Sequence, residues 1–120
     1  RFSLADIMRG GLVIETFTAL AEPSRLRIVE LLKDGPRPVG EIGTRLRLSQ
    51  PQVSKHLAVL RAVDLVRVRK VGRHHYYRVN GPALKPIHDW VKTFEQAWNQ
   101  RLDRLDDVLA EISNEENSRP

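Results

Sequence analysis

The most constraining feature of the sequence is a short turn between two segments with helical periodicity. Residues 39–46 place apolar side chains three or four positions apart, which predicts a helix, and residues 47–49 follow as a tight turn. Ser49 and Gln52 then form the S-x-x-Q pattern of a capping box, in which each side chain accepts a hydrogen bond from the other residue's backbone N–H. A second helix is therefore expected over residues 50–63. Its inward face carries three apolar residues at helical spacing: Val53, Leu57 and Leu60.

Two runs of alternating side chains come directly after this helix. Residues 65–71 and residues 74–79 alternate with a period of two, and Gly72-Arg73 stands between them as a turn. Two such runs around a glycine-containing connection predict a β-hairpin. A helix, a short turn, a second helix and then a hairpin is the element order of a winged helix-turn-helix.

Three further helices complete the predicted fold. Residues 3–21 have helical spacing but contain two adjacent glycines, so we expect an arm followed by a shorter helix from about Leu12. Another helix should run from Pro23, which suits a first turn, to about Lys33. The last helix should run from about Pro82 to Ile112.

The predicted class is mainly α with a β-hairpin (α+β), in the order α-α-α-α-β-β-α. A chain of 120 residues fits one domain, because single domains usually have about 100–150 residues. We expect a core and wing over residues 12–80, a dimerisation helix over residues 82–112 and a frayed polar tail over residues 113–120.

The last predicted helix carries apolar residues along its whole length. They recur every three or four positions, at Leu84, Ile87, Val91, Phe94, Trp98, Leu102, Leu105, Leu109 and Ile112. A helix of about 30 residues is roughly 45 Å long, which is more than so small a body can cover. The apolar stripe therefore predicts a homodimer that pairs through this helix, with help from the first helix.

Positive charge is concentrated in the first two thirds of the chain. Residues 1–80 hold 15 of the 20 basic side chains and only 7 of the 15 acidic ones, whereas residues 101–120 hold 3 basic and 6 acidic side chains. Lys and Arg side chains that contact phosphates release condensed counterions, so this distribution favours a polyanionic partner. A solvated basic surface gives the same totals, and charge alone leaves both interpretations open.

The composition excludes several classes of protein. The chain contains no cysteine, which removes disulfides, thiolate metal sites and cysteine nucleophiles. No apolar run approaches the ~20 residues that cross a bilayer, and no basic-then-apolar leader is present, so we expect a cytoplasmic protein without a membrane partner. No nucleophile elbow, phosphate-binding glycine loop or metalloprotease motif occurs, so we expect neither catalysis nor a cofactor.

The second helix of the turn motif leaves polar side chains on its outer side. They are Gln50, Gln52, Ser54, Lys55 and His56. Helix-turn-helix proteins place such residues against base edges in the major groove, where Gln pairs with adenine and Lys binds guanine or a phosphate. At the hairpin tip, Arg73 and His74 are expected to enter a minor groove or to clamp phosphates. A solvated polar helix and a charged sheet edge are the structural alternatives.

The four histidines do not suggest a metal site. Two ligands on one helix face must lie three or four positions apart, and the positions that follow His88 at this spacing hold Val91 and Lys92. We therefore predict no metal ligand.

Three stretches of the chain resemble the ArsR/SmtB family of bacterial winged-helix repressors: residues 19–28 (ALAEPSRLRI), 48–57 (LSQPQVSKHL) and 71–77 (VGRHHYY). The resemblance spans about residues 14–80. It implies a cytoplasmic homodimer that binds an inverted-repeat operator in double-stranded DNA and represses transcription, usually releasing the DNA when an effector binds. It also implies that Gln52, Ser54 and His56 lie at the operator, with Arg73 in the wing.

Two features of the family's metal sensors are missing. Arsenic- and cadmium-type members carry a cysteine motif before the helix-turn-helix, where this chain has residues 39–42 (VGEI). Zinc- and nickel-type members need a ligand about eleven residues after His88, and that position holds Asn99. The chain resembles the metal-independent members, in which the signal would be an organic ligand, a partner protein or simple autoregulation without an effector. Two alternatives stay open: a winged-helix module that binds another protein, and a metal-responsive repressor with an unrecognised site.

Overall fold

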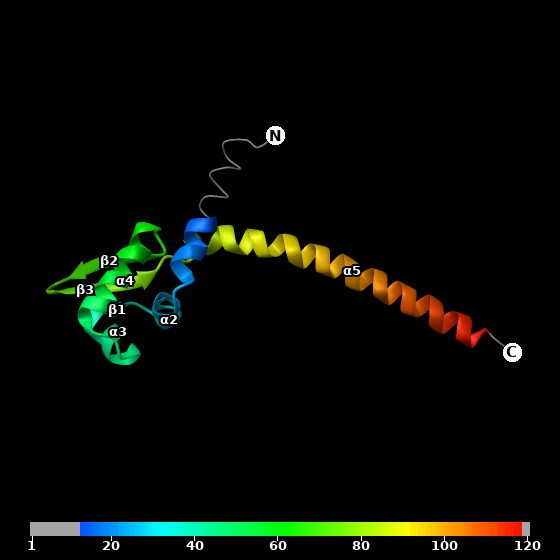
Figure 1. Cartoon of the computed structure of the whole chain (residues 1–120), viewed down its shortest axis with the longest axis horizontal. Coiled ribbons are helices and arrows are strands. Elements are labelled where there is room, and N and C mark those ends of the chain that lie inside the picture. The colour runs from blue at the N-terminus through cyan, green and yellow to red at the C-terminus, as the bar shows by residue number, and fades with distance from the viewer. Residues whose placement is uncertain (1–12, 119–120) are drawn as a thin grey trace, which may run out of the picture. The chain divides into compact units, whose positions relative to one another are not determined.

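The helices before the β2–β3 hairpin begin and end where local sequence signals place them (Figure 1). A computed structural model describes residues 13–118, and residues 13–20 form its first helix. The predicted arm before Leu12 lies outside the described residues. Helix α2 spans Pro23–Leu32, and its N-cap Glu22 accepts a hydrogen bond from the Arg25 backbone N–H. Helix α3 spans Val39–Leu46 and helix α4 spans Gln50–Ala62, so the predicted bounds of these three helices are correct to within one residue.

The sheet has one more strand than the sequence predicted. Strand β2 (Val66–Val71) and strand β3 (His74–Val79) form the expected antiparallel hairpin, joined at Gly72 with φ 61°. Strand β1 (Arg37–Pro38) pairs with the other edge of β3, which gives the order β1-β3-β2. A two-residue strand is too short to show a periodicity, and it contains a proline, which is found only at sheet edges. The sequence therefore gave no signal for β1.

The last helix is longer than predicted. A short 3₁₀ turn, η1, covers Gly81–Leu84, and helix α5 then spans Lys85–Asn117. The prediction of a frayed tail from residue 113 is wrong for residues 113–117, which continue the helix. These residues contain neither glycine nor proline, and two of them are glutamates, which have a high helix propensity.

The described chain divides into two units after Ile87. The first unit has a core shared by α2, α3, α4 and the start of β2, with Ile28, Ile42, Val53, Leu57, Leu60, Leu65 and Val66 fully buried. The second unit is the rest of α5, and none of its residues is buried. Whether residues 1–120 act as one domain stays a prediction. No described helix is both long enough and apolar enough to cross a bilayer.

Candidate nucleic-acid interface

The N-terminus of α4 is held by both bonds of the predicted capping box. The Ser49 backbone N–H donates to Gln52 Oε1 at 2.8 Å, and the Gln52 backbone N–H donates to Ser49 Oγ at 3.3 Å. Pro51 lies in the first turn, where its missing N–H costs no intrahelical bond. This end of α4 is therefore locally well defined before any ligand is present.

The turn between α3 and α4 depends on a close backbone approach. Arg47 adopts the left-handed conformation (φ 57°), and the Leu48 N–H donates to the Gly43 carbonyl at 3.0 Å. A Cβ atom on Gly43 would lie only 2.8 Å from the Leu48 carbonyl oxygen. Only glycine at position 43 lets the turn pack this tightly against α3. The conformation of the turn then sets the direction of α4.

The outer side of α4 presents polar side chains to solvent. Four of the five predicted residues are exposed: Gln50, Gln52, Ser54 and Lys55. The apolar side of the same helix is buried in the core, so α4 cannot turn these side chains inward without losing its packing. The structure therefore brings these four residues together at the N-terminal half of one helix.

The capping box limits what Gln52 can bind. Its Oε1 atom accepts the Ser49 N–H with one of its two lone pairs, which leaves the second lone pair and the amide NH₂ group for a partner. Bidentate pairing with adenine needs both the oxygen and the nitrogen of the side-chain amide. The cap therefore restricts the orientation of the Gln52 amide, and with the cap intact any pairing with adenine must use the second lone pair of Oε1.

His56 is placed differently from the other predicted residues. Its side chain is 18% exposed, and its Nδ1 atom lies 3.7 Å from Glu22 Oε2 at the N-cap of α2. The Nδ1 atom is buried and has no hydrogen-bond partner among the described residues. His56 thus faces the neighbouring helix rather than the exposed group on α4.

The hairpin tip is exposed and basic. Arg73 follows Gly72 in the turn, and His74 begins β3, with its ring 6.3 Å from that of Tyr76 in an edge-on arrangement. The Arg73 side chain contacts no acidic partner in the described part of the chain. The tip can therefore offer its positive charge to a polyanion.

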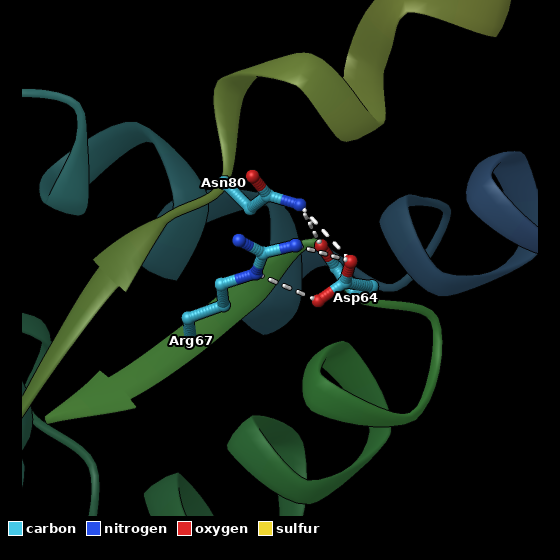
Figure 2. A network of polar contacts seen from close by, with 3 residues as sticks. All are labelled: Asp64, Arg67 and Asn80. Carbon is cyan, nitrogen blue, oxygen red and sulfur yellow. Dashed lines mark hydrogen bonds and ion pairs between the residues drawn. The ribbon is translucent and has the colours of Figure 1, made fainter.

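A polar network at the base of the hairpin connects three elements (Figure 2). Asp64, in the left-handed conformation with φ 59°, accepts from Arg67 Nε at 3.1 Å and from Arg67 Nη2 at 2.9 Å. Asn80 Nδ2 donates to the Asp64 backbone carbonyl at 2.9 Å and to its Oδ2 atom at 3.1 Å. The hydrogen bond from Arg67 lowers the pKa of Asp64 below its usual value of 3.8, and the same pairing raises the pKa of Arg67.

Comparisons with known proteins agree with this geometry. The helix-turn-helix domain family matches residues 20–69. Transcriptional repressor SdpR of Bacillus subtilis is 31% identical over 78 residues, which cover 65% of this chain and 87% of SdpR. The arsenical resistance operon repressor of Escherichia coli is 35% identical over 107 residues, which cover 87% of each protein. The chain belongs to the ArsR family.

A solved structure supports the same assignment. It is the homodimeric winged helix-turn-helix DNA-binding domain of Mb0332 from Mycobacterium bovis, described as a possible ArsR-family transcriptional regulator. The TM-score is 0.65 at 27% identity, over 83% of this chain and 93% of that domain. The predicted winged helix-turn-helix fold and the predicted class, a DNA-binding transcriptional repressor of the ArsR family, are thereby confirmed. These relatives are transcriptional regulators, not enzymes.

The residues of this ArsR-family chain do not fit the metal sites found in some family members. The 120 residues contain no cysteine, and Asn99 stands where the zinc- and nickel-type pattern needs a ligand. Among the residues that the structure describes, no three His, Cys, Asp or Glu side chains form a group that could hold a metal ion.

Sequence reasoning missed the Asp64–Arg67–Asn80 network. Asp64 lies just before β2 and Asn80 just after β3, so the sequence placed both residues at the ends of predicted strands. Their contact joins residues 16 positions apart, and no local pattern in the sequence encodes that pairing.

Proposed function

We propose that this ArsR-family protein represses transcription by binding an inverted-repeat operator in double-stranded DNA as a homodimer. The observation that carries the proposal is the exposed polar group at the N-terminal half of α4: Gln50, Gln52, Ser54 and Lys55. A helix-turn-helix inserts this part of its second helix into the major groove, and these side chains can donate to or accept from base edges there.

The individual roles follow from the contacts of each side chain. Gln50, Ser54 and Lys55 are free to read bases or bind phosphates, whereas Gln52 donates through its amide nitrogen while Ser49 holds its oxygen. His56 is a less direct candidate for base contacts than the other four residues, because its side chain is only 18% exposed and its Nδ1 atom lies 3.7 Å from Glu22 Oε2. Arg73 and His74 contact phosphates or enter the minor groove beside the site bound by α4.

Dimerisation through α5 is the second part of the proposal. Its large apolar side chains are exposed along the whole helix, and Phe94, Trp98 and Leu105 are each more than half exposed. Monomeric proteins rarely expose so long an apolar stripe. A second copy, contributing its own α5 and its helix over residues 13–20, would cover it, and two-fold symmetry would then present two α4 helices to two half-sites. The Mb0332 domain, which is similar to this chain, is homodimeric, and this supports dimerisation itself.

The proposed regulator works in the cytoplasm and needs no catalytic step. Its signal is a small organic molecule, a partner protein or, without an effector, simple autoregulation.

Selection of bound fragments from the promoter region that neighbours this gene, followed by footprinting, tests the proposal. The expected footprint is an inverted repeat whose half-sites are separated by about 10–10.5 base pairs, or a multiple of this spacing. Ser54→Ala should relax the sequence preference. Arg73→Ala should weaken binding to all duplexes and reduce the salt slope by about one. A monomer with no measurable affinity for duplex DNA would contradict the proposal and favour a protein-binding module.

A further inference from the structure

Three arginines surround a hollow at the base of the hairpin, outside the proposed DNA interface. The hollow has a volume of about 290 Å³. Its lining residues come from the end of α4, from the following turn and from both strands of the hairpin: Arg61, Asp64, Val66, Arg67, Val68 and Arg78. Three of these six lining residues are arginines, so the hollow is strongly basic.

Two of these arginines are direct neighbours across the sheet. Arg67 and Arg78 are register partners in the β2–β3 pair, so their side chains leave the same face of the sheet. Like charges directly opposite each other destabilise a sheet. An arginine cannot relieve this repulsion by losing its proton, because its pKa lies far above neutral pH. Arg61 adds a third positive charge to the same hollow.

Only one carboxylate balances these charges. Asp64 binds Nε and Nη2 of Arg67, which leaves the remaining Arg67 nitrogen, Nη1, available. Within the described residues, the side chains of Arg61 and Arg78 form no hydrogen bond or ion pair. The lining therefore carries three positive charges and one negative charge, a net of two positive charges.

The hollow is held in shape by the network in Figure 2. Asn80 is only 7% exposed, and its side chain holds both the backbone and the carboxylate of Asp64. Asp64 in turn orients the guanidinium of Arg67 through two hydrogen bonds. Arg67 is thus fixed before a ligand arrives, which reduces the entropy lost on binding.

We propose that this hollow binds a small dianion with a phosphoryl group, such as inorganic phosphate or a small phosphorylated metabolite. The net charge of the lining matches a dianion, and the fork of a guanidinium matches the oxygen geometry of a phosphoryl group. The volume of about 290 Å³ lies just below the usual range for ligand pockets, about 300–1,000 Å³, so the ligand is small.

The position of the hollow favours a free anion over a phosphate of the operator. Arg61 follows Gln52 by nine residues along α4, which is roughly 14 Å at 1.5 Å per residue. Arg67 is five residues from the turn at Gly72, which is roughly 17 Å along the strand. The hollow is therefore remote from both proposed DNA-contacting ends.

Calorimetric titration of inorganic phosphate into the full 120-residue chain, at constant ionic strength near neutral pH, tests the proposal. The wild-type protein should bind one phosphate per chain in a saturable manner, and Arg78→Gln or Arg61→Gln should weaken binding at least tenfold. Arg69→Gln is the matched control, because Arg69 lies on the same face of β2 and the substitution removes the same charge outside the hollow. It should bind phosphate as the wild type does.

Stability and DNA binding provide independent checks. In phosphate-free buffer at low salt, Arg78→Gln should unfold at the same or a higher temperature than the wild type, because it removes the cross-strand repulsion. It should also leave duplex affinity unchanged in that buffer.

The proposal would be overturned if the wild type showed no saturable phosphate binding, or if Arg69→Gln lost as much phosphate affinity as the variants of the hollow. A loss of duplex affinity in Arg78→Gln would assign the hollow to a DNA phosphate instead. Because the titration contains no DNA, a failure of operator recognition would not affect its result.

Discussion

At the scale of single residues, the side-chain amide of Gln52 has two roles: it caps α4, and we propose that it contacts DNA. Its oxygen caps α4 by accepting the Ser49 N–H, while its nitrogen is exposed on the side of α4 that we propose enters the major groove. Glutamate keeps the acceptor that a capping box needs but brings a negative charge toward phosphates.

We therefore predict opposite outcomes for stability and binding in two variants at this position. Gln52→Glu should unfold at the wild-type temperature or slightly above it, yet bind every duplex at least tenfold more weakly. Gln52→Ala should lose about 0.5–1 kcal/mol of stability because the Ser49 N–H loses its side-chain acceptor. Thermal unfolding and fluorescence anisotropy measure the two effects. Tight operator binding by Gln52→Glu would show that position 52 does not approach the DNA.

The Asp64 carboxylate gives a second prediction at this scale. Its pKa is lowered mainly by the Arg67 hydrogen bond, so its contribution to folding is present above the usual value of 3.8 and is lost as the pH falls through the lowered value. In Arg67→Gln the pKa of Asp64 should rise toward 3.8, and stability just below pH 3.8 should depend less steeply on pH. NMR titration of the carboxylate carbon measures this change. An unchanged titration midpoint of Asp64 in Arg67→Gln would show that the Arg67 hydrogen bond is not the cause of the lowered pKa.

Residue-scale predictions succeeded where the chemistry is local. The S-x-x-Q pattern predicted both bonds of the capping box because all four groups lie within one helical turn. The periodicity of α4 likewise predicted the exposure of Gln50, Gln52, Ser54 and Lys55. It did not predict that the His56 side chain is only 18% exposed, because the neighbour that packs against it, Glu22, lies far away in the sequence.

At the scale of elements, the turn between α3 and α4 depends on glycine at one position. Gly43→Ala would bring a Cβ to 2.8 Å from the backbone oxygen of Leu48, and backbone moves less easily than a side chain. We predict a loss of about 1–3 kcal/mol, typical of overpacking, together with weaker DNA binding as α4 shifts.

A matched control lies in the same helix. A Cβ on Gly40 meets nothing within 4 Å, so Gly40→Ala should gain up to about 1 kcal/mol from helix propensity. Denaturant unfolding of both variants separates the effect of the close approach from that of helix propensity. Equal stabilisation by the two substitutions would mean that the turn does not require the close approach.

Element bounds were largely predictable because caps, prolines and glycines mark them directly. Glu22-Pro23 and Ser49-Gln52 mark two helix starts, and Gly72 marks the hairpin turn. Strand β1 was not predictable, since it exists only through its pairing with β3. The continuation of α5 through residues 113–117 was missed because polarity was interpreted as fraying, although no helix-breaking residue occurs there.

At the scale of the whole molecule, the apolar side of α5 is the surface through which we propose that two copies pair. The stripe was visible in the sequence, but the partner that covers it is not specified by periodicity alone. Leu105 is 52% exposed within it, whereas Gln100 lies about 160° around the helix from Trp98 and about 140° from Leu105.

We predict that Leu105→Asp dissociates the dimer, because each protomer would place a charge in the apolar contact. Gln100→Asp introduces the same side chain on the opposite side and should remain dimeric. Sedimentation equilibrium at micromolar concentration measures both, and retention of the dimer in Leu105→Asp would place the interface elsewhere. The affinity of Leu105→Asp for the operator should fall to the affinity of one protomer for one half-site.

The central claim is that the exposed residues of α4 read a particular DNA sequence. The most direct test compares the affinity of the wild-type protein for its footprinted operator with its affinity for a scrambled duplex of the same length and composition, at ~0.15 M salt. We predict a preference for the operator of at least about 10³-fold, the lower end of the range for specific regulators. Equal affinity for the two duplexes would contradict sequence-specific recognition by α4.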